Sequence, residues 1–225
     1  MKRHTSRIAG VGLNLLLRAS IAAFLADVLR RPNDPRYAGK AIPVRNLLVV
    51  GSLAHLFPLL ALRRRTWRDY PVWTDNLYLS IFWLDMAGNA FNLYDRYTHF
   101  DLIPHLHGSG ALAAVLRHAF GAPPLAAVGL ANGIHVLLEA QEIATDIFCG
   151  THNVRGAWDS AGDLTSGLLG TLLYVGAPEA LKDQRAHDER ERRGRSLPLW
   201  QSGRQSALYL VWLSLGQSRR TSARA

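Results

Sequence analysis

Cysteine and lysine are both scarce in this sequence. Cys149 is the only cysteine among 225 residues, which excludes a disulfide within the chain and any zinc site built from several thiolates. Only 3 of the 26 basic residues are lysines, and the formal net charge is +9. Because much of this charge lies in loops and in the C-terminal tail, attraction to a membrane surface explains it better than nucleic-acid binding. We therefore expect no nucleic-acid partner.

Familiar catalytic signatures are absent as well. The sequence contains no Gly-x-Ser-x-Gly elbow, no His-Glu-x-x-His pair and no glycine loop of the kind that holds phosphates. No internal repeat with a period of roughly 20 to 50 residues is visible either. Any chemistry must therefore depend on residues that the fold brings together from separate segments.

Long apolar blocks are what the sequence has in abundance. Hydrophobic residues make up 48% of the chain, and most of the blocks are about 20 residues long, enough to cross a bilayer core of roughly 30 Å. We predict an all-α fold, a polytopic transmembrane bundle of about six spanning helices. A soluble helical bundle is the alternative, but its helices would carry a continuous polar stripe facing water. The blocks are 10–29, 44–62, 76–93, 103–120, 122–143 and 161–177, with a shorter run at 207–215.

Arginines indicate the orientation of this bundle. The connections after the second, fourth and sixth blocks are basic and are assigned to the cytoplasmic side, which places the loops 95–104 and 146–160 outside. The basic residues at 30–40 break this rule if 10–29 spans the membrane. A block near either terminus is therefore also interpreted as a helix that lies at the membrane interface instead of crossing the bilayer. No signal peptide is evident, because Arg18 interrupts the first block.

This orientation gives a domain organisation and a location. We predict a transmembrane bundle over residues 1–178 and a basic cytoplasmic tail with a short apolar segment over 179–225. The expected location is the bacterial cytoplasmic (inner) membrane, with the lipid bilayer as the main partner and the oligomeric state left open.

Polar residues recur at three- and four-residue spacing near the outer ends of four blocks. Such spacing puts them on one face of each helix. Several carboxylates together would repel one another at low dielectric, and Arg155 is the only fixed positive charge that the sequence places nearby. We predict a polar network that comprises Asp85, Asn89, His99, His135 and Asp146.

The remaining polar residues are ligand types for a divalent metal. Oxygen-rich sets with histidine suit Zn, Mn, Fe or Mg, and the sequence does not choose among them. Glu142 or Asp163 would stay free as the general base of a metal-dependent hydrolase or transferase that acts on an ester or phosphate group of an envelope lipid. Asp101 and Asp159 have an alternative role as helix caps. The predicted ligands are Asp101, His105, Glu139, Glu142, Asp159 and Asp163.

Two other functions stay open at this point. The same cluster is also consistent with a structural membrane protein whose polar groups tie helices together. It is consistent as well with a proton or cation transporter component that uses His135 as a relay, although the apolar inner halves of the fourth and fifth blocks disfavour a conduit. The glycines at 108, 110, 167 and 170 are expected only to let helices approach closely.

Three segments between residues 94 and 173 resemble a known family. They are YDRYTHFDLIPHLHGSG, HVLLEAQEI and GAWDSAGDLTSGLLGTLL. They are similar to the YjdF-like and VanZ-like bacterial integral membrane proteins, in which Asp-x-x-x-His, a glutamate-rich helix and Trp-Asp-x-x-x-Asp occur in that order. The resemblance matches Asp101 and His105 to the first motif, Glu139 and Glu142 to the second, and Asp159 and Asp163 to the third.

This resemblance implies a multi-helix inner-membrane protein. The VanZ-like proteins are associated with glycopeptide resistance and the cell envelope, which is consistent with a lipid-linked substrate. The sequence departs from the family pattern by carrying His99 and His107 beside the first motif, and by its long basic tail.

Overall fold

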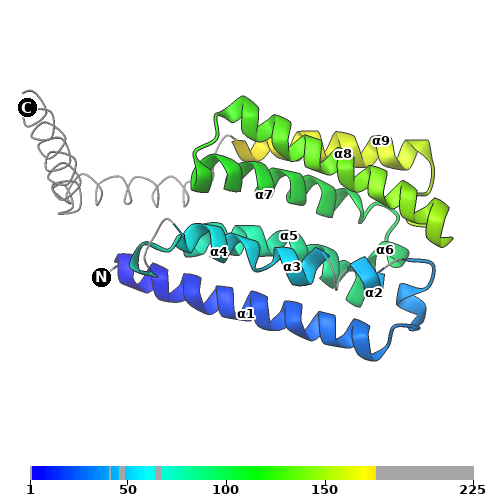
Figure 1. The fold of residues 1–225 in the computed structure, drawn as a ribbon, viewed down its shortest axis with the longest axis horizontal. Coiled ribbons are helices and arrows are strands. Elements are labelled where there is room, and N and C mark those ends of the chain that lie inside the picture. The colour runs from blue at the N-terminus through cyan, green and yellow to red at the C-terminus, as the bar shows by residue number, and fades with distance from the viewer. Residues whose placement is uncertain (1, 41, 46–48, 64–66, 176–225) are drawn as a thin grey trace, which may run out of the picture. The chain divides into compact units, whose positions relative to one another are not determined.

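Five long helices form the body of the computed structural model (Figure 1). The structure describes residues 2–40, 42–45, 49–63 and 67–175, and the predicted tail at 179–225 lies outside them. No strand occurs in this part of the chain, so the predicted all-α class is confirmed there. The long helices are α1 (Lys2–Arg30), α5 (Val72–Ala90), α7 (Leu102–Phe120), α8 (Pro124–Cys149) and α9 (Ala157–Val175).

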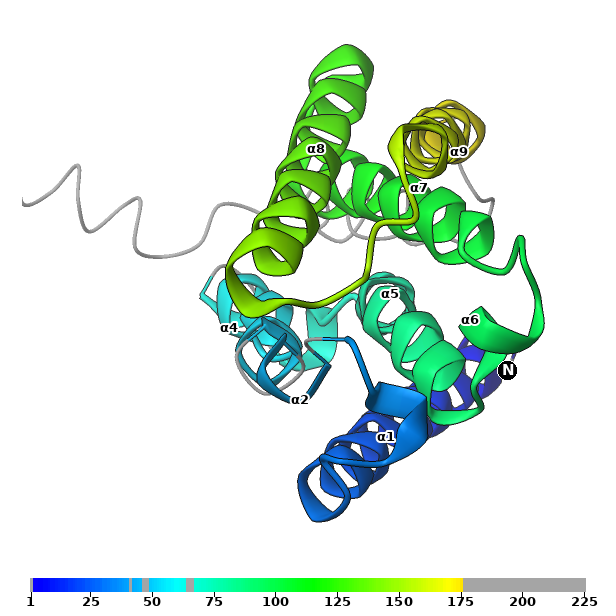
Figure 2. The same ribbon diagram turned by 90° about the vertical axis from the view of Figure 1, so that its right-hand side faces the viewer.

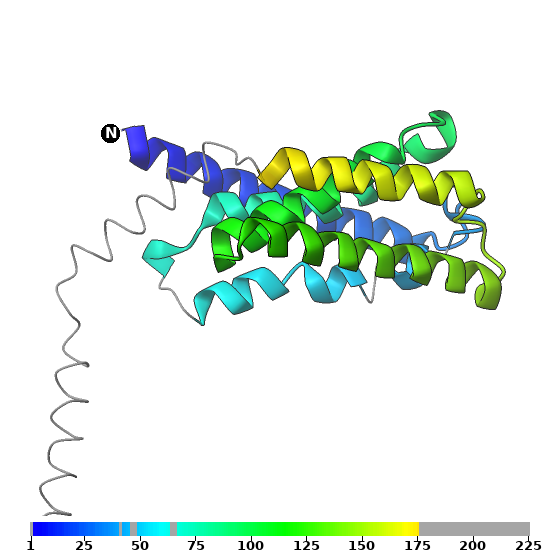
Figure 3. The same ribbon diagram turned by 90° about the horizontal axis from the view of Figure 1, so that it is seen from above.

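Helix α5 lies at the centre of the helices when they are viewed end-on (Figure 2). It packs against α1 on one side and α7 on the other, while α9 runs along α7 and α8 contacts both α7 and α9. Leu79 and Met86 of α5 are buried against Leu17 and Ile21 of α1. The view from above shows these helices running side by side (Figure 3). The buried face of α5 therefore joins the two halves of the bundle.

Glycines set the short distance between α7 and α9. A Cβ atom on Gly110 would lie 2.7 Å from the carbonyl oxygen of Gly170, and one on Gly170 would collide with the Leu106 carbonyl. Side chains at either position would force the helices apart. Gly121, with φ of 76°, ends α7, and Pro124 begins α8 at a position where its missing N–H costs no helical bond.

The second apolar block is not one continuous helix, contrary to the prediction. Its described residues fall into the short helices α2 (Ile42–Arg45), α3 (Gly51–Leu53) and α4 (Leu56–Leu62). Pro58 lies inside α4 and has no N–H to donate to a residue four positions earlier, which weakens helical pairing at that point. Arg45, the last residue of α2, contacts Asp85 of α5 and Glu142 of α8.

One stretch of the described residues, Ser6–Arg30 of α1, is long and apolar enough to cross a membrane. Length and composition alone do not separate a membrane span from a signal sequence here. The other long helices fall short because they carry polar residues that contact one another inside the bundle. Helix α8, for example, includes His135, Glu139 and Glu142 within its apolar sequence. The expected number of about six spans is therefore not shown by helix composition.

Polar and apolar side chains are distributed in an unusual way across these helices. Large apolar side chains face outward, including Leu16 of α1 (65% exposed), Leu137 of α8 (69%) and Leu173 of α9 (67%). Ionisable and polar side chains are buried instead, among them Asp75, His135, Glu139, Asp163 and Thr171. Exposed leucines on three helices, together with buried ionisable side chains, are unusual for a protein whose whole surface meets water.

Basic residues after α1 are neutralised by neighbouring acids. Arg31 and Arg36 pair with Asp27 at 2.9 and 3.0 Å, and Lys40 pairs with Asp95 at 3.1 Å. Hydrogen bonds from the Arg36 side chain and backbone hold the pKa of Asp34 at about 2. Three of the basic residues that appeared to contradict a spanning first helix, Arg31, Arg36 and Lys40, are therefore ion-paired.

Candidate metal centre

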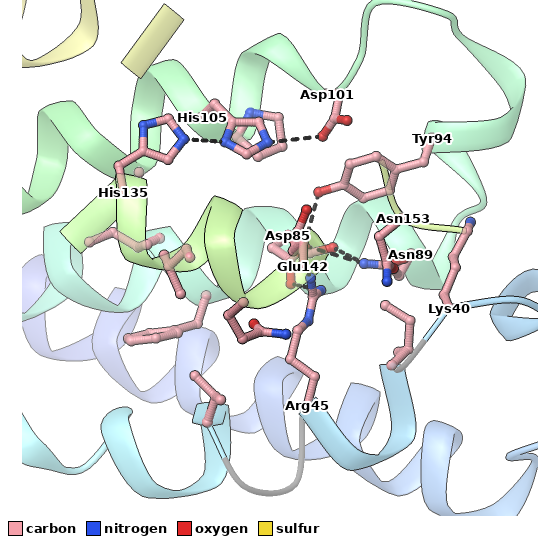
Figure 4. A pocket seen from close by; sticks show the side chains of 18 of the residues that line it. Lys40, Arg45, Asp85, Asn89, Tyr94, Asp101, His105, His135, Glu142 and Asn153 are labelled. Atoms are coloured by element: carbon pink, nitrogen blue, oxygen red, sulfur yellow. Dashed lines mark hydrogen bonds and ion pairs between the residues drawn. The ribbon is translucent and has the colours of Figure 1, made fainter. Parts of the chain in front are cut away.

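His105, one turn into α7, is the central residue of the site. Its Nδ1 atom lies 2.7 Å from Nε2 of His135 on α8. The two rings stack with centroids 4.8 Å apart and an angle of 23° between their planes (Figure 4). Because one imidazole has two ring nitrogens on opposite edges, His105 can face a different group of ligands on each side.

The first group contains His105, His135 and Glu139. Oε1 of Glu139 lies 3.6 Å from Nδ1 of His105 and 3.6 Å from Nε2 of His135. With the 2.7 Å separation of the two nitrogens, these three atoms share a point about 2 Å from each, which is the bond length of zinc to imidazole and carboxylate. His135 and Glu139 are four residues apart on α8, so the helix itself presents both to α7.

The second group uses the other nitrogen of His105. Nε2 lies 3.3 Å from Oδ1 of Asp101, which is one turn earlier on α7, and 3.8 Å from Oδ1 of Asp163 on α9. The three atoms all lie within 4.8 Å of one another. Asp101 was also predicted as a helix cap, but its carboxylate makes no capping hydrogen bond to α7 and contacts His105 instead.

Two carboxylate oxygens in these groups are buried without a hydrogen bond. They are Oε1 of Glu139 and Oδ1 of Asp163, on side chains whose residues are each 4% exposed. An unsatisfied buried carboxylate oxygen is costly unless a cation or a proton accompanies it. Each group therefore contains one oxygen that is positioned as a ligand and has no other partner among the described residues.

An arginine that the sequence did not single out lies beside these groups. Arg45 of α2 donates to Asp85 at 2.7 Å and approaches Glu142 at 3.4 Å. Tyr94 also donates to Asp85, at 2.9 Å, and Asn89 donates to the same residue from the next turn of α5. Arg155 is thus not the only fixed positive charge near the carboxylates, which corrects that expectation.

Three of the predicted polar residues lie away from His105. Asp146 accepts hydrogen bonds from Thr151, Asn153 and Val154, so it fixes the loop after α8 and does not join the two ligand groups. Asp159 accepts the backbone N–H of Arg155 at 3.0 Å, as a residue at the start of α9 can. His99 is exposed in the turn before α7. None of these three side chains forms a hydrogen bond or ion pair with His105 or its ligand groups, so no contact supports the roles predicted for them.

Glu142, another predicted ligand, belongs to neither group of three. It contacts Arg45 and lines the same cavity as His105 and Asp101. Of the six predicted ligands, Asp101, His105, Glu139 and Asp163 are brought together by the fold, and His135 joins them from the predicted network.

Sequence reasoning missed two residues that support His135. The hydroxyl of Ser109 lies 3.1 Å from Nδ1 of His135 and so can fix the tautomer of that ring. Ser109 is four residues after His105, and this spacing is the signal that could have identified it. Gly167 of α9 lies directly against the His135 ring, where any Cβ atom would collide with it.

Comparisons with family models, with curated proteins and with solved structures find no match to this chain. The resemblance to YjdF-like and VanZ-like proteins therefore stays a prediction.

Substituting Gly167 by alanine is expected to disturb the site without weakening α9. Alanine favours helix by about 1 kcal/mol over glycine, but its methyl group would displace the His135 ring from His105. We expect the metal affinity to fall by about tenfold or more, since displacing groups that orient ligands has effects of that size. Gly133→Ala on α8, which has open space around it, is the matched control. Equal metal affinity in both variants, measured by titration, would contradict the assignment of His135.

Proposed function

We propose that the protein is a multi-pass integral membrane protein of the bacterial cytoplasmic membrane that uses one or two divalent metal ions, held around His105, to cleave an ester or phosphate-ester bond of an envelope lipid. The observation that carries the proposal is the pair of buried oxygens of Glu139 and Asp163, which accept no hydrogen bond from the described residues and face opposite nitrogens of His105.

The charge of the site supports a metal. Six carboxylates line the cavity or belong to the ligand groups, against three basic side chains, Lys40, Arg45 and Arg155. Such an excess of negative charge in a region of low dielectric is relieved by protons or by cations. One or two dications would bring the summed charge of these groups close to zero. The carboxylates are Asp85, Asp95, Asp101, Glu139, Glu142 and Asp163.

The distribution of side chains supports a membrane location with several spans. Leucines on α1, α8 and α9 face outward, while the polar groups face one another inside. Helices that carry ionisable residues on their inner faces can still span a bilayer, because the cost of a buried charge falls when it has partners. In this proposal α5, α7, α8 and α9 span the membrane together with α1, and the site lies near its outer surface.

The residues present suit a hydrolytic reaction. A bound divalent ion would polarise the scissile group and lower the pKa of water. Glu142 lines the cavity, belongs to neither ligand group and contacts Arg45, so its carboxylate would accept the proton of the attacking water. The water oxygen then forms the new bond to carbon or phosphorus, the bond to the alcohol oxygen breaks, and the alcohol leaves with the proton that Glu142 carries.

The metal part of the proposal is tested by elemental mass spectrometry on the purified full-length protein. We expect at least one equivalent of a transition metal or magnesium that survives dialysis. Folded protein that stays free of metal after incubation with Zn, Mn, Fe and Mg salts would overturn this part. That result would favour a structural role, for which the contact of Arg45 with both α5 and α8 is the supporting observation.

Cys149 offers a direct test of the membrane part. This single cysteine is exposed at the end of α8 nearest the site. A membrane-impermeant maleimide should label it in intact spheroplasts, and Cys149→Ser should abolish the labelling. Phe120 lies at the end of α7 that is farther from the site. The Phe120→Cys variant, made in the Cys149→Ser background, should react only after permeabilisation. Labelling of both positions from the same side would contradict the proposed crossing.

A conduit is less well supported than an enzyme. The contacts from Asp101 through His105 and His135 reach Ser109. Beyond Ser109, the buried residues described on α7 are the glycine, alanines and valine of positions 110 to 115. These side chains cannot exchange protons, so the relay has no evident continuation along α7.

A further inference from the structure

A cavity of about 280 Å³ lies beside the His105 centre, between α5, α7, α8 and the segment around Arg45. It extends along α7 from Asp101 to Leu112, a distance of about 16 Å at the helical rise per residue. Figure 4 shows His105 and His135 toward one side of it and Lys40 with Asn153 toward the other. The cavity is therefore long enough for an extended ligand.

The lining changes character along this length. The end nearest the loops is polar and includes Lys40, Asn153 and Arg155, while His105 and Glu142 line the middle. The opposite end is apolar and is formed by Val50, Phe82, Leu112, Ile134 and Leu138. A ligand that matches both ends has a polar head and a hydrocarbon chain.

Arg155 gives the polar end its preference of charge. Its guanidinium donates to the backbone carbonyls of Tyr94 and Thr98, and it forms no ion pair with a carboxylate of the described residues. Lys40 and Arg45, by contrast, are already paired with acids. Arg155 therefore has positive charge available for an anionic head group, and arginine binds phosphate through several N–H groups at once.

We propose that the cavity binds a single-chain lipid phosphate, with its phosphate at Arg155 and its alkyl chain in the apolar end between Phe82, Leu112 and Ile134. The bond that joins head to chain then lies beside His105 and Glu142. This inference rests on the proposed function for its catalytic meaning, but lipid binding itself requires neither the metal nor turnover.

Binding is measured by native mass spectrometry of the full-length protein in phosphatidylcholine nanodiscs. The probes are octanoyl lysophosphatidic acid, whose extended length matches the cavity, monooctanoin, which has the same chain without the phosphate, and butanoyl lysophosphatidic acid. We expect the first probe to bind about tenfold more tightly than either of the others, because a charge-assisted contact and an apolar contact each contribute roughly that factor. Equal affinity for octanoyl lysophosphatidic acid and monooctanoin would overturn the phosphate assignment.

Two substitutions separate the two ends of the cavity. Arg155→Gln should reduce the preference for phosphate to less than about twofold, and Arg96→Gln, an exposed arginine outside the cavity lining, should leave it unchanged. Ile134→Trp should weaken the octanoyl probe without affecting the butanoyl probe. Leu137→Trp, which is 69% exposed on the same helix, is its control. Loss of affinity for both chain lengths in Ile134→Trp, or no loss at all, would exclude the apolar end as the chain site.

Failure of this inference is distinguishable from failure of the metal assignment. Metal content and lipid affinity are measured on the same preparations, and Asp163→Asn, at a ligand outside the cavity lining, should lose the ion of the second group while it retains the phosphate preference. Metal binding without lipid selectivity would overturn only the lipid inference. Lipid selectivity in protein without metal would leave the cavity assigned and remove the catalytic centre.

Discussion

Replacing His105 by alanine is expected to abolish metal binding at both ligand groups. His105 is the residue that the two groups share, with Nδ1 toward His135 and Glu139 and Nε2 toward Asp101 and Asp163. Removing groups that only orient a ligand lowers metal affinity by about 10- to 100-fold, and removing the ligand itself should cost at least about 100-fold. Elemental mass spectrometry after dialysis should therefore find metal near background.

Further variants show whether one ion or two are present. Glu139→Gln should remove only the ion of the first group, and Asp163→Asn only that of the second, because each group contains its own buried carboxylate. His99→Ala, an exposed histidine in the turn before α7, should retain all the metal. If His105→Ala is folded and keeps the wild-type metal content, the site lies elsewhere. If it fails to fold, the Glu139 and Asp163 variants still test the assignment.

The second large effect is expected at a buried ion pair between α1 and α5. Asp75 is fully buried and accepts 2.7 Å contacts from both Arg18 and Asn14, and the Asn76 side chain donates to the carbonyl of Gly10. Asp75→Ala would leave the Arg18 charge in an apolar setting without its partner. Breaking a buried pair in this way costs about 3–5 kcal/mol. Unfolding of the purified protein in detergent, followed by circular dichroism, measures the loss.

A surface pair provides the matched control for this prediction. Asp95 pairs with Lys40 at 3.1 Å, and its side chain is 46% exposed, so Asp95→Ala should cost about 1 kcal/mol or less. Combining Arg18→Met with Asp75→Leu should recover much of the lost stability, because no buried charge then remains without a partner. Equal destabilisation by Asp75→Ala and Asp95→Ala would show that the Arg18 contact is not an important tie between α1 and α5.

Much of the candidate site was predictable because helical periodicity is local. Asp101 and His105 are four residues apart, as are His135 and Glu139, and this spacing alone places each pair on one helix face. The sequence did not reveal that His135 contacts His105 directly, since that contact joins α8 to α7. Nor did it separate Asp159 and Asp146, which bind nearby backbone groups, from Asp163, because all three occur at similar spacing.

Arg45 and Arg18 show a different limit. Both lie in or beside apolar blocks, where an isolated arginine predicts a partner but does not identify it. The partners are Asp85 and Asp75, which lie 40 and 57 residues away along the chain. Only the packing of α5 against α1 and α2 brings these charges together.

The sequence by itself determined the helical class, the helix faces on which acids and histidines lie, and the absence of disulfide chemistry, because these follow from composition and from spacing within one helix. The tertiary structure decided which faces meet, that His105 stands between two ligand groups, and that a cavity with a polar and an apolar end runs beside it. The physical reason is that a helix face is specified by residues three and four positions apart, whereas contacts between helices depend on close packing of distant segments such as the glycine-lined approach of α7 to α9.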